Sequence, residues 1–248
     1  MKVLITSGGT SEKIDAVRSI TNHSTGALGK NIADLLLANG HSVHMLSTSS
    51  AIHPSPHPLL TLSLLTNTSE LGIQLEKILK EEKIDAVVHA MAVSDYTPTQ
   101  LVSAQELARF LYKNASWDEQ SLEETLISFS KIPQTLNVQK KRSSQDAQLF
   151  LTMSQNPKWV RKIKSWSPNT RLVAFKLVVN SSTEETSSIV QNMFKATQAD
   201  AILQNDLVNI EGDQHLASLF TATGSRLKAS TKHEIAALIT EFLEEKHD

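Results

Sequence analysis

Short apolar runs alternate with amphipathic segments along the whole chain. Runs that are rich in Val, Ile and Leu and bounded by turn residues predict buried strands, whereas apolar residues at helical spacing predict helices. The predicted strands cover residues 2–6, 42–46, 60–65, 85–93, 149–153, 171–178, 201–203 and 215–220. The predicted helices cover residues 26–39, 68–82, a short stretch after 103, 156–166, a stretch after 182, and 231–245.

Capping residues support several of these helices. Ser103 is followed three residues later by Glu106, and Ser182 by Glu185, which is the spacing of a capping box. Asn156 stands before a proline, which predicts an N-cap with proline at the first helical position. Gly40 follows the first helix as a C′ glycine.

Strands that alternate with helices predict an α/β fold in three layers, with a mostly parallel central sheet covered on both faces. We interpret residues 1–248 as a single α/β domain with an irregular flap segment at about 97–147. Ligands of such sheets bind outside the carboxyl ends of the strands. Informative residues are therefore expected just after strands.

The first candidate motif, Ser7-Gly8-Gly9-Thr10, follows the first strand. Glycines allow backbone N–H groups to approach a phosphate closely, although the same residues also suit an ordinary tight turn. The dinucleotide fingerprint G-x-G-x-x-G is absent, and no acidic residue ends the second strand to bind a ribose hydroxyl. These absences count against a nicotinamide enzyme.

The second motif is the long stretch from residue 12 to 29, which carries Arg18 and Asn22. A guanidinium suits a phosphate or carboxylate, and an asparagine amide can hydrogen-bond a developing oxyanion. The stretch exceeds the usual ~2–6 residues of a strand-to-helix connection. The alternative interpretation is an Ω-loop whose polar groups satisfy its own backbone.

Two further motifs carry candidate chemistry. The segment from His89 to Asp95 ends the fourth strand with small residues, and Asp95 can hold an amide, a hydroxyl or Mg²⁺, or can simply form an N-cap or Asx turn. The basic run with Lys140 and Lys141 can close over a triphosphate, or it can be a solvated face.

Composition excludes several classes of protein. The net charge of −2 provides no basic field for nucleic acid, and no apolar run approaches the ~20 residues that span a bilayer. The chain has no cysteine, which removes disulfides, thiolate metal sites and cysteine nucleophiles. His53 and His57 lie in a proline-rich loop, where solvated side chains are more common than metal ligands. A cytoplasmic location follows by default.

Together these motifs resemble the phosphopantothenate–cysteine ligases, also called phosphopantothenoylcysteine synthetases. The matching segments are ITSGGTSEKIDAVRSITNHSTGALG, AMAVSDYTP, KRSS leading to NPKWV, AFKLV and QADAILQNDL. The likeness is strongest to the free-standing bacterial form, because no flavin-dependent decarboxylase half precedes residue 1. The resemblance implies a Rossmann-like core and a homodimer.

The resemblance also implies a reaction in two steps. The carboxylate of 4′-phosphopantothenate attacks the α-phosphorus of CTP, or of ATP in eukaryotic members, with Mg²⁺ assisting. The amine of L-cysteine then attacks the acyl-nucleotide, in coenzyme A biosynthesis. CTP is expected over ATP, and a separate phosphopantothenoylcysteine decarboxylase is an implied partner.

Residue roles follow from the resemblance position by position. Arg18 and Asn22 match the residues that contact the substrate phosphate and acyl group, with Arg18 reaching the site of the neighbouring subunit. Lys141 matches the flap lysine, and Met91, Ala92 and Asp95 line the substrate pocket. The residues that match the nucleotide site are Gly8, Gly9, Thr10, His89, Ala90, Met91, Asp95, Lys141, Pro157, Lys158, Trp159, Val160, Phe175 and Lys195.

The chain departs from the family pattern at two places. Arg142 replaces the usual isoleucine, so Lys140 remains a second claimant for the flap role. The basic residue expected just before the QAD segment is displaced to Lys195, which weakens its assignment to phosphate. Two rival interpretations are a nicotinamide-dependent reductase and a nucleotide-sensing regulator that binds CTP without turnover.

Overall fold

A computed structural model describes residues 1–131, 147–212 and 214–245. Contacts within the described chain divide it into two compact units. Unit 1 consists of Met1–Thr10, His23–Val93 and Lys158–Asp248, and unit 2 consists of Ser11–Asn22 and Ser94–Pro157. Our interpretation of 1–248 as a single domain stays a prediction.

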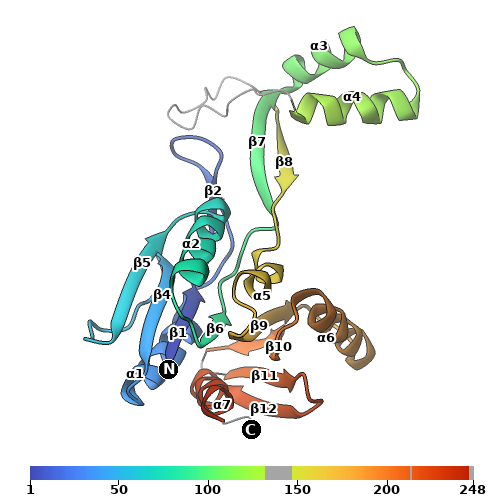
Figure 1. Cartoon of the computed structure of the whole chain (residues 1–248). Helices are drawn as coiled ribbons and strands as arrows, with labels where there is room; N and C mark the ends of the chain where they lie inside the picture. Colours follow the sequence, from blue (N-terminus) through green and yellow to red (C-terminus); the bar gives the residue numbers. More distant parts are fainter. Residues whose placement is uncertain (132–146, 213, 246–248) are drawn as a thin grey trace. The chain divides into compact units, whose positions relative to one another are not determined.

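Unit 1 is built on an eight-stranded sheet with the order β12-β11-β10-β9-β6-β1-β4-β5 (Figure 1). The pairs from β5 to β10 are parallel, and β11 and β12 add antiparallel strands at one edge. The strands are β1 (Lys2–Ser7), β4 (Ser42–Thr48), β5 (Leu60–Leu65), β6 (Ala86–His89), β9 (Arg171–Val178), β10 (Ala201–Glu211), β11 (Gln214–Thr221) and β12 (Arg226–Thr231). The predicted mostly parallel α/β sheet is therefore confirmed.

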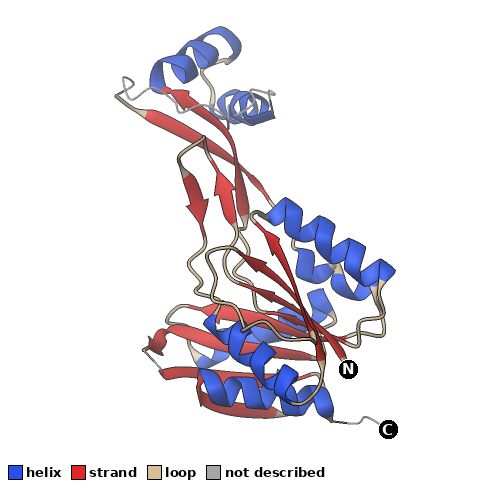
Figure 2. Cartoon of the chain, turned by 90° about the vertical axis from the view of Figure 1, so that its left-hand side faces the viewer, coloured by secondary structure: helices blue, strands red, loops and turns tan. Residues whose placement is uncertain are grey.

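Helices cover both faces of this sheet, as Figure 2 shows. One core packs α1 (Ala27–Ala38) and α7 (Lys232–Glu244) on one face. The other core packs α2 (Thr68–Glu81), α5 (Ile163–Trp166) and α6 (Thr183–Thr197) on the opposite face. Alternate strand residues divide between the two cores: Ile5 belongs to the first and Leu4 to the second. Because both faces are buried, the strands read as continuous apolar runs.

Unit 2 contains a hairpin, a two-stranded ribbon and two helices. The hairpin pairs β2 (Ser11–Lys13) with β3 (Ser19–Thr21), and the ribbon pairs β7 (Tyr96–Ser103) with β8 (Leu149–Gln155). The helices are α3 (Ala104–Asn114) and α4 (Glu119–Lys131). Phe110 of α3 and Phe129 of α4 have ring centroids 4.7 Å apart, which joins the two helices.

Several expected helix starts are confirmed by their caps. The Ser103–Glu106 and Ser182–Glu185 capping boxes both form, and Thr231 accepts from the backbone N–H of Glu234. The predicted helix at 156–166 is wrong in its first part. Only the 3₁₀ turn η1 (Trp159–Arg161) and the short α5 are helical there.

Other differences follow from contacts that the local pattern does not contain. The strand expected over 85–93 ends at His89, because the next residues bond to the loop after β1. The stretch from 12 to 29, expected as a long loop, contains most of the β2–β3 hairpin, which begins at Ser11. Within the segment 97–147, which we expected to be irregular, residues 97–114 and 119–131 are regular and form most of β7 with α3 and α4.

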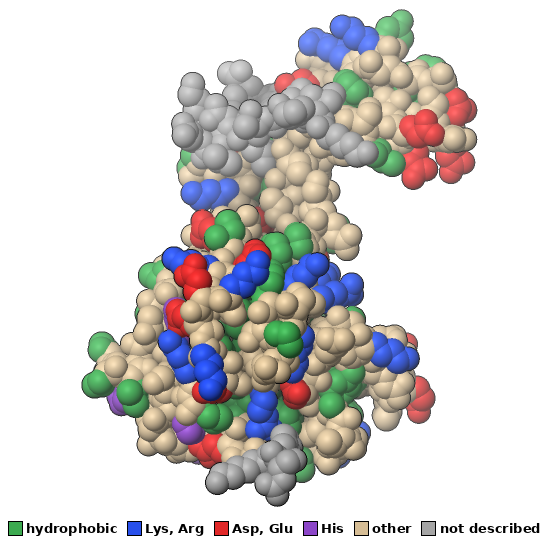
Figure 3. All heavy atoms as spheres, viewed as in Figure 1, with side chains coloured by type: hydrophobic (Ala, Val, Ile, Leu, Met, Phe, Trp, Pro, Cys, Tyr) green, Lys and Arg blue, Asp and Glu red, His purple; other side chains and the backbone are tan. Residues whose placement is uncertain are grey.

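Charged side chains of both signs are mixed on the visible surface of unit 1. Figure 3 shows Lys and Arg side chains interspersed with Asp and Glu over unit 1, so the face in view has no continuous basic field. Within the described ranges, no helix is long and apolar enough to cross a membrane.

Gly72 makes a close approach between α2 and the segment after β8. A Cβ at this position would overlap atoms Cε2 and Cζ2 of the Trp159 ring. The indole Nε1 of Trp159 donates to the carbonyl oxygen of Thr68 at 2.7 Å, which holds the ring against the helix. The absence of a side chain at Gly72 therefore lets Trp159 lie on α2.

We expect Gly72→Ala to lower the free energy of unfolding by ~1–3 kcal/mol through overpacking against Trp159. In a Trp159→Leu background the ring is absent, and the same change should stabilise the helix by about 0.5–1 kcal/mol. Urea denaturation of the four proteins measures both effects. Equal losses in the two backgrounds would contradict the assigned contact.

Candidate functional site

Backbone hydrogen bonds join the loops that follow β1 and β6 in unit 1. Ala90 N donates to Thr6 O at 3.1 Å, Ala92 N donates to Gly8 O at 2.9 Å, and Thr10 N donates to Ala92 O at 3.0 Å. The structure therefore brings together the predicted glycine motif and the segment after His89. Both lie at the carboxyl ends of parallel strands, where ligands of this fold bind.

Gly8 allows this turn for two physical reasons. Its φ of +86° lies in the left-handed region, and an added Cβ would come within 2.5 Å of the Thr48 hydroxyl oxygen. A side chain here would be strained and would clash with β4. The tight turn considered from the sequence is therefore present at Gly8, where the absence of a side chain leaves room for Thr48 of β4. The approach to a phosphate stays a prediction.

A buried side-chain network lies beneath these loops. The Thr6 hydroxyl lies 2.9 Å from Nδ1 of His89 and accepts from the backbone N–H of Met91 at 3.3 Å. Burial lowers the pKa of His89 to about 4. His89 is therefore neutral at pH 7, and it supports the Met91 backbone through Thr6 rather than through charge.

A third predicted segment, Lys158 to Val160, is connected to the same frame through α2. Trp159 donates to Thr68 O, and the Thr68 hydroxyl donates to the Thr10 hydroxyl at 3.4 Å. Trp159 also stacks on Trp166, with centroids 6.2 Å apart. The indole N–H of Trp159 is thus used within the protein, and its ring packs in the core under α2.

The remaining predicted residues of unit 1 lie on β9 and α6. Phe175 is partly buried in the carboxyl half of β9 and pairs with Leu203. Lys195 is exposed in the last turn of α6, shortly before β10 begins at Ala201. Because β9 and β10 are parallel and α6 connects them, Lys195 lies toward the amino end of β10.

Lys176 is a candidate residue that the sequence interpretation missed. It follows Phe175 on β9, is partly buried, and pairs with Gln204 of β10. Within the described part of the chain, no carboxylate or hydrogen-bond acceptor contacts its ammonium. The AFKLV segment contains this lysine, so a charged residue inside a predicted buried strand was the available signal.

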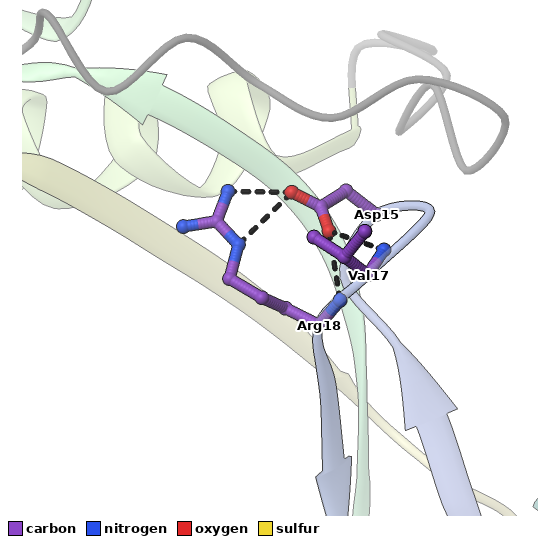
Figure 4. A network of polar contacts seen from close by, with 3 residues as sticks. All are labelled: Asp15, Val17 and Arg18. Carbon is purple, nitrogen blue, oxygen red and sulfur yellow. Dashed lines mark hydrogen bonds and ion pairs between the residues drawn. The ribbon is translucent and has the colours of Figure 1, made fainter.

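In unit 2, Arg18 lies at the tip of the β2–β3 hairpin and Asn22 directly follows β3. Figure 4 shows Arg18 engaged by the carboxylate of Asp15, with Nε 2.9 Å from Oδ2. The same carboxylate accepts from the backbone N–H groups of Val17 and Arg18. The guanidinium is therefore held by the hairpin and does not move freely in solvent.

Asp95 and Pro157 belong to a second cluster in unit 2. The Thr97 hydroxyl lies 3.0 Å from Oε2 of Glu12 and 2.8 Å from Oδ1 of Asn156. Asn156 N donates to Asp95 O at 2.9 Å, and its side-chain amide donates to Ser94 O. The expected N-cap role of Asn156 is wrong, because its side chain joins β7 to the end of β8. Asp95 itself is exposed, and Pro157 follows this junction.

Lys140 and Lys141, the two claimants for the flap lysine, lie outside the described residues. No group of three or more His, Cys, Asp or Glu residues that could hold a metal occurs in the described ranges. His53 Nε2 contacts Ser47 and Thr48, whereas His57 Nδ1 accepts from Leu59 N, so the two rings have separate partners.

Comparisons with known proteins find relatives of the family that these motifs resemble. The family profile of the DNA/pantothenate metabolism flavoprotein C-terminal domain matches residues 1–111. The solved structure of the DNA/pantothenate metabolism flavoprotein from Streptococcus pneumoniae is 36% identical, with a TM-score of 0.82 and 98% of each chain covered. The chain belongs to the DNA/pantothenate metabolism flavoprotein family. The resemblance to phosphopantothenate–cysteine ligases is thereby confirmed at the level of the family.

Two of the curated relatives match most of the chain. The coenzyme A biosynthesis bifunctional protein CoaBC of Thermococcus kodakarensis is 26% identical over 98% of this chain and 51% of its own length. The phosphopantothenate–cysteine ligase CAB2 of Saccharomyces cerevisiae is 27% identical over 79% of this chain and 60% of its own length. The chain thus spans about half to three-fifths of these relatives.

The neutral state of His89 predicts a pH dependence of stability. The unfolded chain protonates His89 near 6.5, whereas the folded protein does so near 4. The folded state therefore loses stability as pH falls from about 6.5 to 4, by up to about 3 kcal/mol. His89→Asn keeps a polar atom near Thr6 but does not titrate in this range.

We expect the wild-type advantage in free energy of unfolding over His89→Asn to shrink as pH falls from 7 to 4. Urea denaturation at several pH values measures this difference, with the exposed His57→Asn as the control for histidine replacement. A difference that stays constant from pH 7 to 4 would contradict a buried, neutral His89.

Proposed function

We propose that this protein is a phosphopantothenate–cysteine ligase of coenzyme A biosynthesis. The observation that carries the proposal is the pairing of the 8–10 and 90–92 loops at the carboxyl edge of the sheet. The 36% identity to the Streptococcus pneumoniae flavoprotein over 98% of both chains supports it. The yeast relative has the ligase name, which this proposal extends to the present chain.

The proposed reaction requires no nucleophile from the protein. A carboxylate oxygen of 4′-phosphopantothenate attacks the α-phosphorus of CTP, and the bond to pyrophosphate breaks. The amine of L-cysteine then attacks the acyl carbon, loses a proton, and displaces CMP. The protein contributes by holding the reactants together, an effect worth ~7–11 kcal/mol in well-oriented systems.

The proposed residue roles are those implied by the resemblance to the phosphopantothenate–cysteine ligases. Gly8, Gly9 and Thr10 would line the phosphate site, and residues 90–92 would contact substrate and nucleotide. Asn22 would donate to the acyl or phosphoryl oxygen, and Arg18 would bind the substrate phosphate from the neighbouring subunit of a homodimer. Lys141 would close over the triphosphate, and the proposed nucleotide contacts also include His89, Asp95, Pro157 to Val160, Phe175 and Lys195.

Mg²⁺ is proposed as the metal that accompanies CTP. The described residues contain no acidic cage, but Mg²⁺ is commonly held by substrate phosphates with one or two carboxylates. Asp95, an exposed carboxylate after β6, is the proposed protein ligand. Bound there, the ion would neutralise part of the triphosphate charge.

The proposal also includes the location of the protein and the enzyme that uses its product. The protein is proposed to act in the cytoplasm and to pass its product to a decarboxylase. The bifunctional CoaBC name of one relative supports a link between two coenzyme A activities.

A pyrophosphate-release assay tests the proposed function. We expect release that requires both 4′-phosphopantothenate and a nucleotide, with CTP preferred over ATP, and phosphopantothenoylcysteine formation when cysteine is added. A nucleotide-sensing regulator would bind CTP without releasing pyrophosphate, and a reductase would change nicotinamide fluorescence on binding. Either of those results in place of pyrophosphate release would overturn the proposal.

Asn22→Asp should slow the chemistry more than it weakens nucleotide binding. The amide can donate to a developing oxyanion, whereas a carboxylate cannot donate and repels the same oxygen. Loss of one such donor lowers the rate by ~10²–10³-fold. Single-turnover kinetics and CTP binding measure the two effects, and Asn169→Asp in an exposed turn is the matched control. Normal turnover with weak CTP binding would make Asn22 a nucleotide contact instead.

A further inference from the structure

A buried carboxylate organises the tip of the β2–β3 hairpin. The side chain of Asp15 is only 4% exposed. Its Oδ1 accepts from Val17 N at 3.0 Å and from Arg18 N at 2.9 Å. Oδ2 accepts from Nε of Arg18 at 2.9 Å and from Nη2 at 2.5 Å. One side chain therefore fixes both the turn backbone and the guanidinium of Arg18.

The contact uses one edge of the guanidinium and leaves the other edge available. Arg18 has five N–H donors, of which Asp15 takes the Nε hydrogen and one Nη2 hydrogen. Both hydrogens of Nη1 and the second of Nη2 have no partner among the residues that the structure describes. The Arg18 side chain is 43% exposed, and Nη1 points away from Asp15 in Figure 4.

We propose that Asp15 is a positioning residue that holds Arg18 with its Nη1–Nη2 edge presented to the phosphate of the substrate. This inference rests on the proposed function, which assigns that phosphate to Arg18. Two parallel N–H donors on one edge match two oxygens of a phosphate dianion. Asp15 reaches the substrate only through Arg18.

The physical gain is preorganisation. An unrestrained arginine loses rotamer freedom when it binds, at a cost of ~0.5–1.5 kcal/mol per side chain. The carboxylate of Asp15 orders the side chain before the substrate arrives, and two backbone N–H groups fix the position of that carboxylate. Because Asp15 is buried, its charge also needs the guanidinium as a partner.

Asp15→Asn separates the turn from the arginine contact. The amide oxygen can still accept from Val17 N and Arg18 N, so the hairpin tip should remain folded. The amide nitrogen replaces Oδ2 and presents a donor to the donors of Arg18, which should release the guanidinium. We expect KM for 4′-phosphopantothenate to rise about 3- to 10-fold, the range of the ordering cost. KM for CTP and for cysteine should stay within experimental error.

Asp118→Asn is the matched control. Asp118 also accepts a backbone N–H, from Ser121 at 2.9 Å, but has no arginine partner within the described ranges. Its replacement should leave all three KM values unchanged. Asp15→Ser, which keeps a short acceptor for the turn, is a second variant for the case in which Asp15→Asn does not fold.

A double-mutant cycle with Arg18→Ala decides the assignment. If Asp15 acts through Arg18, then Asp15→Asn should have no further effect on KM for 4′-phosphopantothenate in the Arg18→Ala background. Equal effects in both backgrounds would overturn the positioning role while leaving the ligase proposal intact. Wild-type protein that releases no pyrophosphate would overturn the ligase proposal and this inference with it. An unchanged substrate KM in Arg18→Ala would remove the phosphate role of Arg18, and with it the role of Asp15.

Discussion

The pairing of β1 with β6 is the constraint on which the candidate site depends. Both strands end within the sheet, and their next backbone groups still need hydrogen-bond partners because they are buried. Ala92 and Thr10 satisfy this need by bonding across the two loops instead of continuing the strands. The result is a rigid frame of backbone at the carboxyl edge, made of residues more than 80 positions apart in the sequence.

Side chains beneath this frame are consistent with a supporting role. His89 and Thr6 are buried and hydrogen-bonded to each other. The Thr6 hydroxyl also accepts a hydrogen bond from the backbone N–H of Met91. Trp159 reaches the same frame through the N-terminal turn of α2. The imidazole of His89 and the indole of Trp159 thus contribute here by packing and hydrogen bonding within the protein.

The candidate residues of the two units differ in kind. Unit 1 presents backbone groups at the carboxyl edge, whereas unit 2 carries the fixed guanidinium of Arg18 on a hairpin tip. In the proposed reaction, in which 4′-phosphopantothenate carries a phosphate, a cation that is ordered in advance would reduce the entropy lost on binding. The buried carboxylate of Asp15 provides this order and is itself compensated by the guanidinium and two amides.

The sequence by itself determined the alternation of strands and helices, the capping boxes and the family. Each of these follows from residues that are close in the chain, as at Ser182 and Glu185, or from contiguous motifs such as SGGT. Only the tertiary structure decided where β6 ends, what Asn156 bonds to, and that His89 is neutral. Those outcomes depend on partners distant in sequence: Thr6 for His89, and Ser94 and Thr97 for Asn156. The hairpin at 11–21 lacked a strong apolar alternation because its short strands carry mostly polar residues, so its pairing became visible only in the fold.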